Sequence, residues 1–600
     1  GPLAISDSEA CRLRDLMTHR GPDDAGLWRG GGLDAATGCS AGCPEVLLAH
    51  RRLAVLDPTP AGHQPMVTPE TLDSGRFVLV YNGELYNEPE LRQRLIREGV
   101  RLSTGCDTET LLCWLASRGR AGLADLRGMY ALALYDRLEQ SLLLARDPLG
   151  IKPLYRWLGQ QAGADLLLFA SEPVPILEHP AVTPEPDLLG ISTYLTTIRT
   201  VLGERTMFAG VRSLLPGQSL VFDLRGDRLT SNHSALGLET PAIAETQAAR
   251  FGQVQESLHE SVTAHLRADV PTCCLLSGGL DSAIITSIAN DHHADLRTYC
   301  AGSPEAAPVN GISQADDFAH ARSLAETLGT HHTEVAVDRA MFLDRWREMV
   351  AAQGVPLSTP NEVAINAVAQ RLRADGCVVT LSGEGADEIF GGYDHTLRPA
   401  AAHIAAGNVE PGLFHLRAAA WCPVEAKLRL FTRETWARLD GDAHLRGWFA
   451  EEFAATARGE EPLADHLRFQ RRVNLTGLLQ RLDTATMLAS VEGRTPFADR
   501  WVAGLAEGLP MGDRFVPPGR TKIALREAFA GVLPASIVQR PKASFPLPFQ
   551  RWLDGVGDCF GKSALLRELV RPEVLSRVAA SPGEHWNLAW PLANLAIWGE

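Results

Sequence analysis

A short apolar run near the middle of the chain ends in the sequence SGGLDS, which opens an apolar helical run. Two adjacent glycines, Gly278 and Gly279, allow the backbone to approach an oligophosphate closely, and the hydroxyls of Ser277 and Ser282 can donate hydrogen bonds to its oxygens. No lysine follows the glycines, so this is not a Walker-type loop. Asp281 would repel a phosphate unless a divalent cation lay between them. The sequence therefore predicts a pyrophosphate-binding loop that carries a magnesium ligand.

A second turn of the same design follows later in the chain. The apolar run Cys377–Leu381 leads into Ser382 and Gly383, and acidic residues then begin a helix. Ligands of doubly wound sheets bind at the carboxyl ends of the strands, so we expect the two turns to face one nucleotide from either side. Asp281 and Asp387 would then share the metal.

Longer segments around these turns, and others in the N-terminal part, match the motifs of one family in order and spacing. They are SGGLDS at 277–282, LSGEGADEIFGGY at 381–393, Ser490–Phe497, Lys522–Arg526, His19–Asp23, His50–Leu53, Tyr81–Asn87, Asp107–Glu109 and Ala145–Tyr155. The first four resemble the synthetase half of glutamine-hydrolysing asparagine synthetase, and the others resemble its glutaminase domain. The resemblance covers almost the whole chain.

The elements that must position these residues differ between the two parts of the chain. Residues 1 to about 195 alternate polar turns with short strand-like runs, which are Val46–Leu48, Arg76–Tyr81, Tyr130–Tyr135, Ser141–Ala145 and Leu166–Ala170. After residue 247, helical patterns alternate with short apolar strands, which indicates a parallel α/β sheet, and from about Glu410 the chain is mostly helical.

The resemblance implies a fold for each part. Residues 1–195 would form a class II glutamine amidotransferase domain, an N-terminal-nucleophile αββα sandwich, and residues 196–247 a connecting hairpin and linker. Residues 248–600 would form the adenylating domain, a doubly wound parallel α/β ATP-pyrophosphatase with a helical C-terminal part.

The resemblance also implies the reaction and its residues. A carboxylic acid would attack the α-phosphorus of ATP, pyrophosphate would leave, and ammonia from glutamine would attack the resulting acyl-adenylate. Lys522 is expected to stabilise the phosphoryl transition state, and Glu384 to handle protons as ammonia attacks. The expected contacts to ATP and pyrophosphate are Ser277, Gly278, Gly279, Ser282, Ser382 and Gly383, with Mg²⁺ on Asp281 and Asp387. Glu388 is expected to be structural.

Other residues of this half are assigned less directly. Arg494 is expected in a buried ionic network with Glu492 or Asp483. The sequence departs from the family at four places, which are Ala543–Phe545, Gly493, Gln353–Pro356 and Thr484–Thr486. Such changes leave adenylation intact but can alter which acid is adenylated. The acid is therefore aspartate, which would give asparagine, or a specialised acid of a biosynthetic pathway.

Five residues of the N-terminal part match the family's glutamine site. Asn82 and Gly83 match the oxyanion hole that stabilises a tetrahedral intermediate. The glutamine carboxylate and α-amine would be held by Arg52, Glu84 and Asp107. A thiol precedes this aspartate, at Cys106, where the family has serine, and we interpret it as packing rather than catalytic.

The nucleophile of that site is not found in the printed sequence. The family uses an N-terminal cysteine whose own α-amine acts as the base, whereas this sequence begins with Gly1. Cys11 lies in a predicted helix, Asp7–His19, and cannot take the role while ten residues precede it. Either a Cys-Gly-Ile strand is missing from the sequence, or the nucleophile was lost naturally, and the retained glutamine residues favour the first.

The net charge and the distribution of apolar residues limit the classes of partner that we expect. A net charge of −15 over 600 residues argues against a general affinity for nucleic acid or anionic membrane. No apolar run approaches the roughly 20 residues of a membrane span, so we expect a soluble cytoplasmic protein, with a homodimer considered as its assembly. Two rivals stay open: a β-lactam synthetase-like or peptide-cyclising ligase that uses an internal amine without glutamine, and a silent scaffold.

Overall fold

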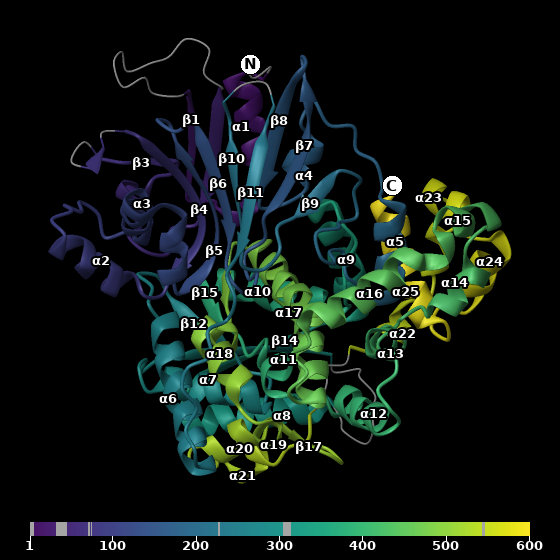
Figure 1. Ribbon diagram of the computed structural model, residues 1–600. Coiled ribbons are helices and arrows are strands. Elements are labelled where there is room, and N and C mark those ends of the chain that lie inside the picture. Colours follow the sequence, from purple (N-terminus) through teal and green to yellow (C-terminus); the bar gives the residue numbers. More distant parts are fainter. Residues whose placement is uncertain are drawn as a thin grey trace.

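A computed structural model describes residues 5–31, 45–69, 72–73, 75–225, 228–303, 314–542 and 547–600. Figure 1 shows two stacked regions. The upper one, purple to blue, is built from antiparallel sheets of the first part of the chain. The lower one holds a parallel sheet with helices around it, and C-terminal helices extend to its right. Of the described residues, none belongs to a helix long and apolar enough to cross a membrane.

The upper region is centred on a six-stranded antiparallel sheet with the strand order β11-β10-β6-β5-β4-β3. Its strands are β3 Met66–Val67, β4 Phe77–Leu85, β5 Gly128–Asp136, β6 Ser141–Arg146, β10 Gln218–Asp223 and β11 Thr230–Ala235. In β5 nearly every residue is buried because both faces of the sheet are covered. The hairpin β10–β11 pairs with β6 and so extends this sheet at one edge.

Different layers cover the two faces of this sheet. Helices α2 (Glu88–Arg97) and α3 (Asp107–Arg118) pack their leucines against one face. The other face packs on a second strand layer, made of β1 Asp24–Gly30, β2 Val46–Arg52, β7 Tyr155–Gln161, β8 Ala164–Ala170 and β9 Val211–Ser213. Helix α1 (Asp7–Asp15) lies on β1 and β2. The layer order is αββα, and this prediction is confirmed.

The lower region contains a five-stranded parallel sheet with the strand order β14-β13-β12-β15-β16. Its strands are β12 Thr272–Leu275, β13 Arg297–Gly302, β14 His331–Ala336, β15 Val379–Leu381 and β16 Glu492–Arg494. The helices around it are α6 Gln247–His265, α7 Leu280–Asn290, α8 Gln314–Leu328, α9 Arg339–Gln353, α10 Asn361–Ala374 and α17 Pro462–Met487. The strand order reverses between β12 and β15, which is where ligands of such sheets bind. The predicted doubly wound sheet is confirmed.

The C-terminal part is mostly helical, as expected. Its helices are α11 Ala386–Phe390, α12 Asp394–Ala405, α13 Pro411–Ala418, α14 Val424–Leu430, α15 Arg433–Arg438, α16 Ala443–Thr456, α18 Arg500–Gly508, α19 Met511–Arg514, α20 Ile523–Ala528, α21 Ala535–Val538, α22 Phe549–Trp552, α23 Ala564–Leu569, α24 Pro572–Ala580 and α25 Trp586–Trp598. Strand β16 interrupts them and was not predicted, because three residues are too short to show a period.

The two regions share a hydrophobic core. Met129 and Ile151 of the upper region are buried with Val254 and Leu475 of the lower one. The ring centroids of Tyr86 and His265 are 3.8 Å apart across the same boundary. This packing brings the end of β4 close to the end of β16.

Candidate functional site

The first glycine turn leads from β12 into α7. Gly278 has φ +68°, a conformation that glycine adopts without steric cost. The Ser282 hydroxyl accepts a hydrogen bond from the Ser277 amide at 3.1 Å and donates one to the Gly279 carbonyl at 3.2 Å. These bonds fix the loop in an open form at the start of the helix, as a phosphate cradle requires.

The second glycine turn packs directly on the first. A Cβ at Gly383 would lie 2.9 Å from the Cβ of Asp281 and 3.1 Å from the Ser282 amide nitrogen, so only glycine allows this approach. Ser382 is held by its amide, which donates to the carbonyl of Arg494 at 2.8 Å. The two turns therefore form one site, on adjacent strands of the sheet.

Lysines neutralise the two aspartates of this site. The Lys522 Nζ lies 2.6 Å from the Asp281 Oδ2 and 2.6 Å from the Asp387 Oδ1, and its side chain is 4% exposed. Lys542 adds a contact of 2.6 Å to the Asp387 Oδ2. Burial alone would raise the pKa of Asp387, but the two lysines outweigh it and hold this pKa well below its ordinary value.

The donor set fits a divalent cation. Four carboxylate oxygens from two facing turns are the hard ligands that Mg²⁺ prefers. The described residues contain no cluster of three or more His, Cys, Asp or Glu that would hold a metal unaided, so phosphate and water oxygens would complete the coordination.

Sequence reasoning missed several residues here. Arg540 donates to the Gly278 carbonyl at 2.8 Å, and Lys542 contacts Asp387 as described. Arg481 forms an ion pair of 2.7 Å with Glu384 and donates to Thr359. The two basic residues of the sequence RPK, directly before residues 543–546, were the signal that could have found the first pair.

These side chains line one cavity of about 350 Å³. Every predicted synthetase-site residue except Gly278 is among its lining residues, and Lys542, Arg540 and Tyr393 join them. Glu388 is buried behind the wall and accepts a hydrogen bond of 2.6 Å from the Tyr393 hydroxyl. Burial, with the nearby Asp387 charge, raises the pKa of Glu388 to about 7.

A second cavity, of about 140 Å³, lies in the upper region. It is lined by all five residues predicted to hold glutamine, which are Arg52, Asn82, Gly83, Glu84 and Asp107. A Cβ at Gly83 would lie 2.0 Å from the Met129 carbonyl oxygen, so β4 and β5 can pair here only through glycine. The Asn82 amide nitrogen donates to the Ser171 hydroxyl at 3.2 Å.

The carboxylates of this cavity are buried. Asp107 accepts hydrogen bonds of 3.1 Å from the Leu85 amide and from the Tyr81 hydroxyl. Burial raises the pKa of Asp107, and raises that of Glu84 well above its ordinary value. Both terminal nitrogens of Arg52 donate hydrogen bonds to backbone carbonyls, those of Leu56, Asp57 and Thr59. Arg52 therefore holds the loop 56–59 in place as well as lining the cavity.

Two cysteines were considered for this site. Cys106 is buried at the cavity wall, where burial raises the pKa of its thiol to about 12, so this thiol is not a nucleophile at neutral pH. Cys11 lies in α1 and is not among the cavity-lining residues.

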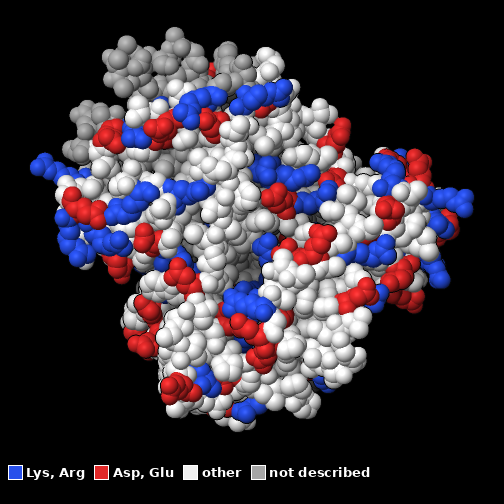
Figure 2. Space-filling view, viewed as in Figure 1, with Lys and Arg blue, Asp and Glu red and all other residues white. Residues whose placement is uncertain are grey.

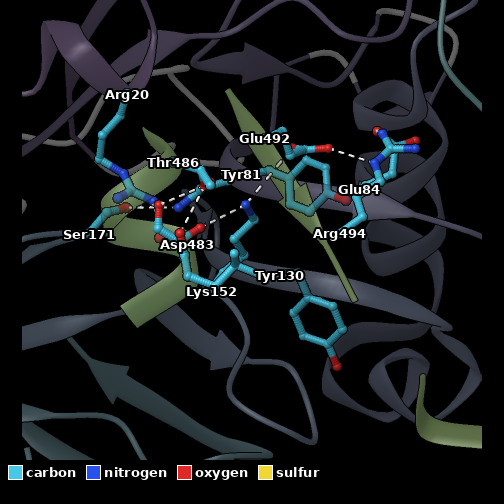
Figure 3. Close-up of polar contacts among 12 residues, drawn as sticks. Arg20, Tyr81, Glu84, Tyr130, Lys152, Ser171, Asp483, Thr486, Glu492 and Arg494 are labelled. Carbon is cyan, nitrogen blue, oxygen red and sulfur yellow. Dashed lines mark hydrogen bonds and ion pairs between the residues drawn. The ribbon is translucent and has the colours of Figure 1, made fainter. Parts of the chain in front are cut away.

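An ionic network connects the two regions (Figure 3). Asp483 on α17 binds Lys152 at 2.9 Å and Arg20 at 2.7 Å. Arg494 binds Glu492 at 2.8 Å, as predicted, and also binds Glu84 of the upper cavity at 2.8 Å. That second partner was not predicted from the sequence.

A small third cavity, of about 40 Å³, lies between the other two. It shares Ser171 with the upper cavity and Arg481 with the lower one. Gln353, Val355 and Thr484, all from segments that depart from the family pattern, line it. Ala543–Phe545 lie outside the described residues.

The surface around this seam carries charges of both signs. On the face shown in Figure 2, Lys and Arg are interspersed with Asp and Glu, and the molecule is hollowed near its centre, between the upper and lower regions. A substrate entering there would meet local rather than global positive charge.

Comparisons with known proteins match both halves. The family model described as asparagine synthase matches residues 253–600, and the one described as glutamine amidotransferase domain matches residues 4–233. A putative glutamine-hydrolyzing asparagine synthetase of Mycobacterium tuberculosis (strain ATCC 25618 / H37Rv) is 33% identical over 586 residues, covering 92% of this chain and 85% of the relative.

A less similar relative also matches over nearly its whole length, and one solved structure aligns weakly. Glutamine-hydrolyzing asparagine synthetase 3 of Bacillus subtilis (strain 168) is 28% identical, covering 96% of this chain and 91% of the relative. Among solved structures, the glutamine phosphoribosylpyrophosphate amidotransferase of B. subtilis aligns with a TM-score of 0.27 and 14% identity over 63% of this chain and 79% of that one. A likeness this weak supports no conclusion.

Proposed function

This chain belongs to the asparagine synthase family, and from this premise we propose that it adenylates a carboxylic acid with ATP and amidates it with ammonia from glutamine. It is an enzyme, a carbon–nitrogen ligase of the glutamine-hydrolysing type. The observation that carries the proposal is the single cavity in which both glycine turns, Asp281, Asp387 and Lys522 meet.

In the first step, a carboxylate oxygen attacks the α-phosphorus and the bond to the β-phosphate oxygen breaks. The amides and hydroxyls of the two turns would hold the pyrophosphate oxygens, and Lys522 would stabilise the charge that develops there. Asp281 and Asp387 would hold Mg²⁺, whose charge offsets that of the leaving pyrophosphate. Because Lys522 now binds both aspartates, we expect it to exchange this contact for phosphate oxygens when ATP binds.

In the second step, ammonia attacks the acyl carbon, AMP leaves with the carbon–oxygen bond electrons, and the nitrogen loses a proton. Glu384 lines the cavity and would accept that proton. Its ion pair of 2.7 Å with Arg481 would hold the carboxylate in place at the cavity wall.

Ammonia would come from glutamine bound in the upper cavity by Arg52, Glu84 and Asp107, with Asn82 and Gly83 as the oxyanion hole. The small cavity between the two sites would be its route, because it shares wall residues with both. An internal-amine ligase is not favoured, because the amidotransferase model matches residues 4–233 and the glutamine residues line one cavity.

The acid is proposed to be aspartate, with a specialised biosynthetic acid as the alternative. The departing residues around the middle cavity, including Gln353 and Thr484, support keeping both. We test this by measuring pyrophosphate release from ATP and Mg²⁺ with an ammonium salt across a panel of acids. Release with aspartate supports the first, and release only with another acid supports the second.

Three coarser proposals accompany this one. We propose residues 1–195 as the glutaminase domain, residues 196–247 as a connecting hairpin and linker, with the hairpin β10–β11 added to the edge of the upper sheet, and residues 248–600 as the adenylating domain. A homodimer and a cytoplasmic location are proposed as well. Sedimentation and fractionation test the last two.

A further inference from the structure

Arg494 contacts both candidate sites. Its side chain binds the Glu84 Oε2 at 2.8 Å, at the wall of the upper cavity. Its carbonyl accepts the Ser382 amide at 2.8 Å, at the start of the second phosphate turn. Arg494 lies at the end of β16, paired with Leu381 of β15, and its side-chain partner Glu84 lies near the end of β4. One residue therefore contacts strand ends of both regions.

The guanidinium of Arg494 has no freedom to move independently. It is 0% exposed, binds Glu492 at 2.8 Å, and donates to the carbonyls of His265 and Arg267 at 2.7 Å each. Figure 3 shows it between Glu84 and Glu492. A displacement of Glu84 must therefore be followed by the arginine and its backbone, because breaking these buried bonds is costly.

Glu84 offers a ligand one free oxygen. While its Oε2 holds Arg494, its Oε1 is buried and has no hydrogen-bond partner among the described residues. Asp107 lines the same cavity. Burial raises the pKa of both carboxyls, so a cation entering the cavity would favour their ionised forms. An ionised Glu84 would bind Arg494 more strongly.

We propose that Arg494 is a positioning residue that couples glutamine binding at Glu84 to the phosphate turn at Ser382, so that glutamine tightens ATP binding. This inference rests on the proposed function, since the cation is the α-ammonium of glutamine. The coupling would let the adenylation site bind ATP more tightly when glutamine, the source of ammonia, is bound. Binding linkage is reciprocal, so ATP must tighten glutamine binding by the same factor.

The test measures both affinities by titration calorimetry. The ligands are L-glutamine and a non-hydrolysable α,β-methylene ATP analogue with Mg²⁺, each titrated with and without the other. We expect each ligand to tighten the other about fivefold or more, which is the lower end of typical coupling. Equal affinities with and without the second ligand would overturn the proposal.

Arg494→Lys retains the charge but cannot bind two carboxylates and two carbonyls at once. It should bind each ligand alone while the coupling falls below twofold, and full coupling in this variant would overturn the proposal. Arg127→Lys is the matched control. Arg127 is also buried and also crosses the boundary, binding Asp499 at 2.7 Å, but it lines none of the three cavities. It should keep the coupling.

A second measurement needs no variant. Glutamine should slow hydrogen exchange of the Ser382 amide in the wild-type protein, and unchanged exchange would contradict the coupling even if Arg494→Lys fails to fold. If glutamine does not bind at all, both the glutamine site and the coupling are wrong. If glutamine binds and coupling is absent, only the role of Arg494 is wrong.

Discussion

The lower and upper cavities compensate the charge of their buried and partly buried carboxylates in opposite ways. In the lower one, Asp281 and Asp387 are paired with Lys522 within the cavity, and the pKa of Asp387 is held low. In the upper one, the only basic side chain paired with Glu84 among the described residues is Arg494, from the other region of the molecule. The first site is thus electrostatically self-contained, whereas the second depends on the boundary.

We expect the largest effect from removing the lysine that pairs with both aspartates of the lower cavity. Lys522→Ala should reduce acid-dependent pyrophosphate release about 100- to 1,000-fold, because a fixed cation at the transition state is worth about 3–4 kcal/mol. Lys562→Ala, on an exposed lysine, is the control. A loss of less than about fivefold would remove Lys522 from the chemistry.

Glu384→Gln should separate the two chemical steps. Exchange of labelled pyrophosphate into ATP should continue, while amide formation with ammonium falls about 100-fold, the lower range for losing a general base. Loss of the exchange together with the amide would instead assign Glu384 to adenylation.

Replacing an aspartate should show that each cavity, assayed without the ligand of the other cavity, has its own function. Asp281→Asn should reduce pyrophosphate release to below about 1% of the wild-type rate. The affinity for glutamine should stay within about twofold, because Asp281 lines the lower cavity and not the upper one. The same change at Asp107 should weaken glutamine about tenfold or more and leave ammonium-dependent release intact. Weaker glutamine binding by the Asp281 variant, or slower ammonium-dependent release by the Asp107 variant without glutamine, would refute this assignment of the two functions.

The smallest effect concerns stability and pH. Burial raises the folded-state pKa of Asp107, so its contribution to stability is present below the ordinary value of about 3.9 and is lost as pH rises through the folded-state pKa. Asp107→Asn has no carboxyl to titrate at this position. In the absence of glutamine, the melting temperature of the variant minus that of the wild type should therefore increase as the pH is raised from about 4 to about 8. A difference in melting temperature that is the same at every pH would contradict a raised pKa of Asp107 in the folded protein.

The contrast also explains what the sequence could predict. The phosphate turns were predicted because their signals are local, namely glycines beside acids after short apolar runs, whereas the αββα layers were implied by the family resemblance. Arg494 was expected to bind Glu492 or Asp483, and it binds Glu492, two residues away. Its partner Glu84 lies 410 residues away, and only the packing of the two regions brings them together.

Local signals also failed in weak strands. The strand β1, with the sequence DAGLWRG, contains two glycines and no alternation, and was not predicted. It forms because β2 pairs with it over its whole length. Arg481, the partner of Glu384, was missed because it lies in the long helix α17, with no motif around it. Lys542, the partner of Asp387, was missed although the sequence RPK could have indicated it.

The central claim, adenylation of a carboxylic acid at the two glycine turns, is tested most directly by the products of ATP. With Mg²⁺, an ammonium salt and the correct acid, the protein should release AMP and pyrophosphate in equal amounts, and none without the acid. Formation of ADP and phosphate, or equal release with and without every acid tested, would contradict the claim.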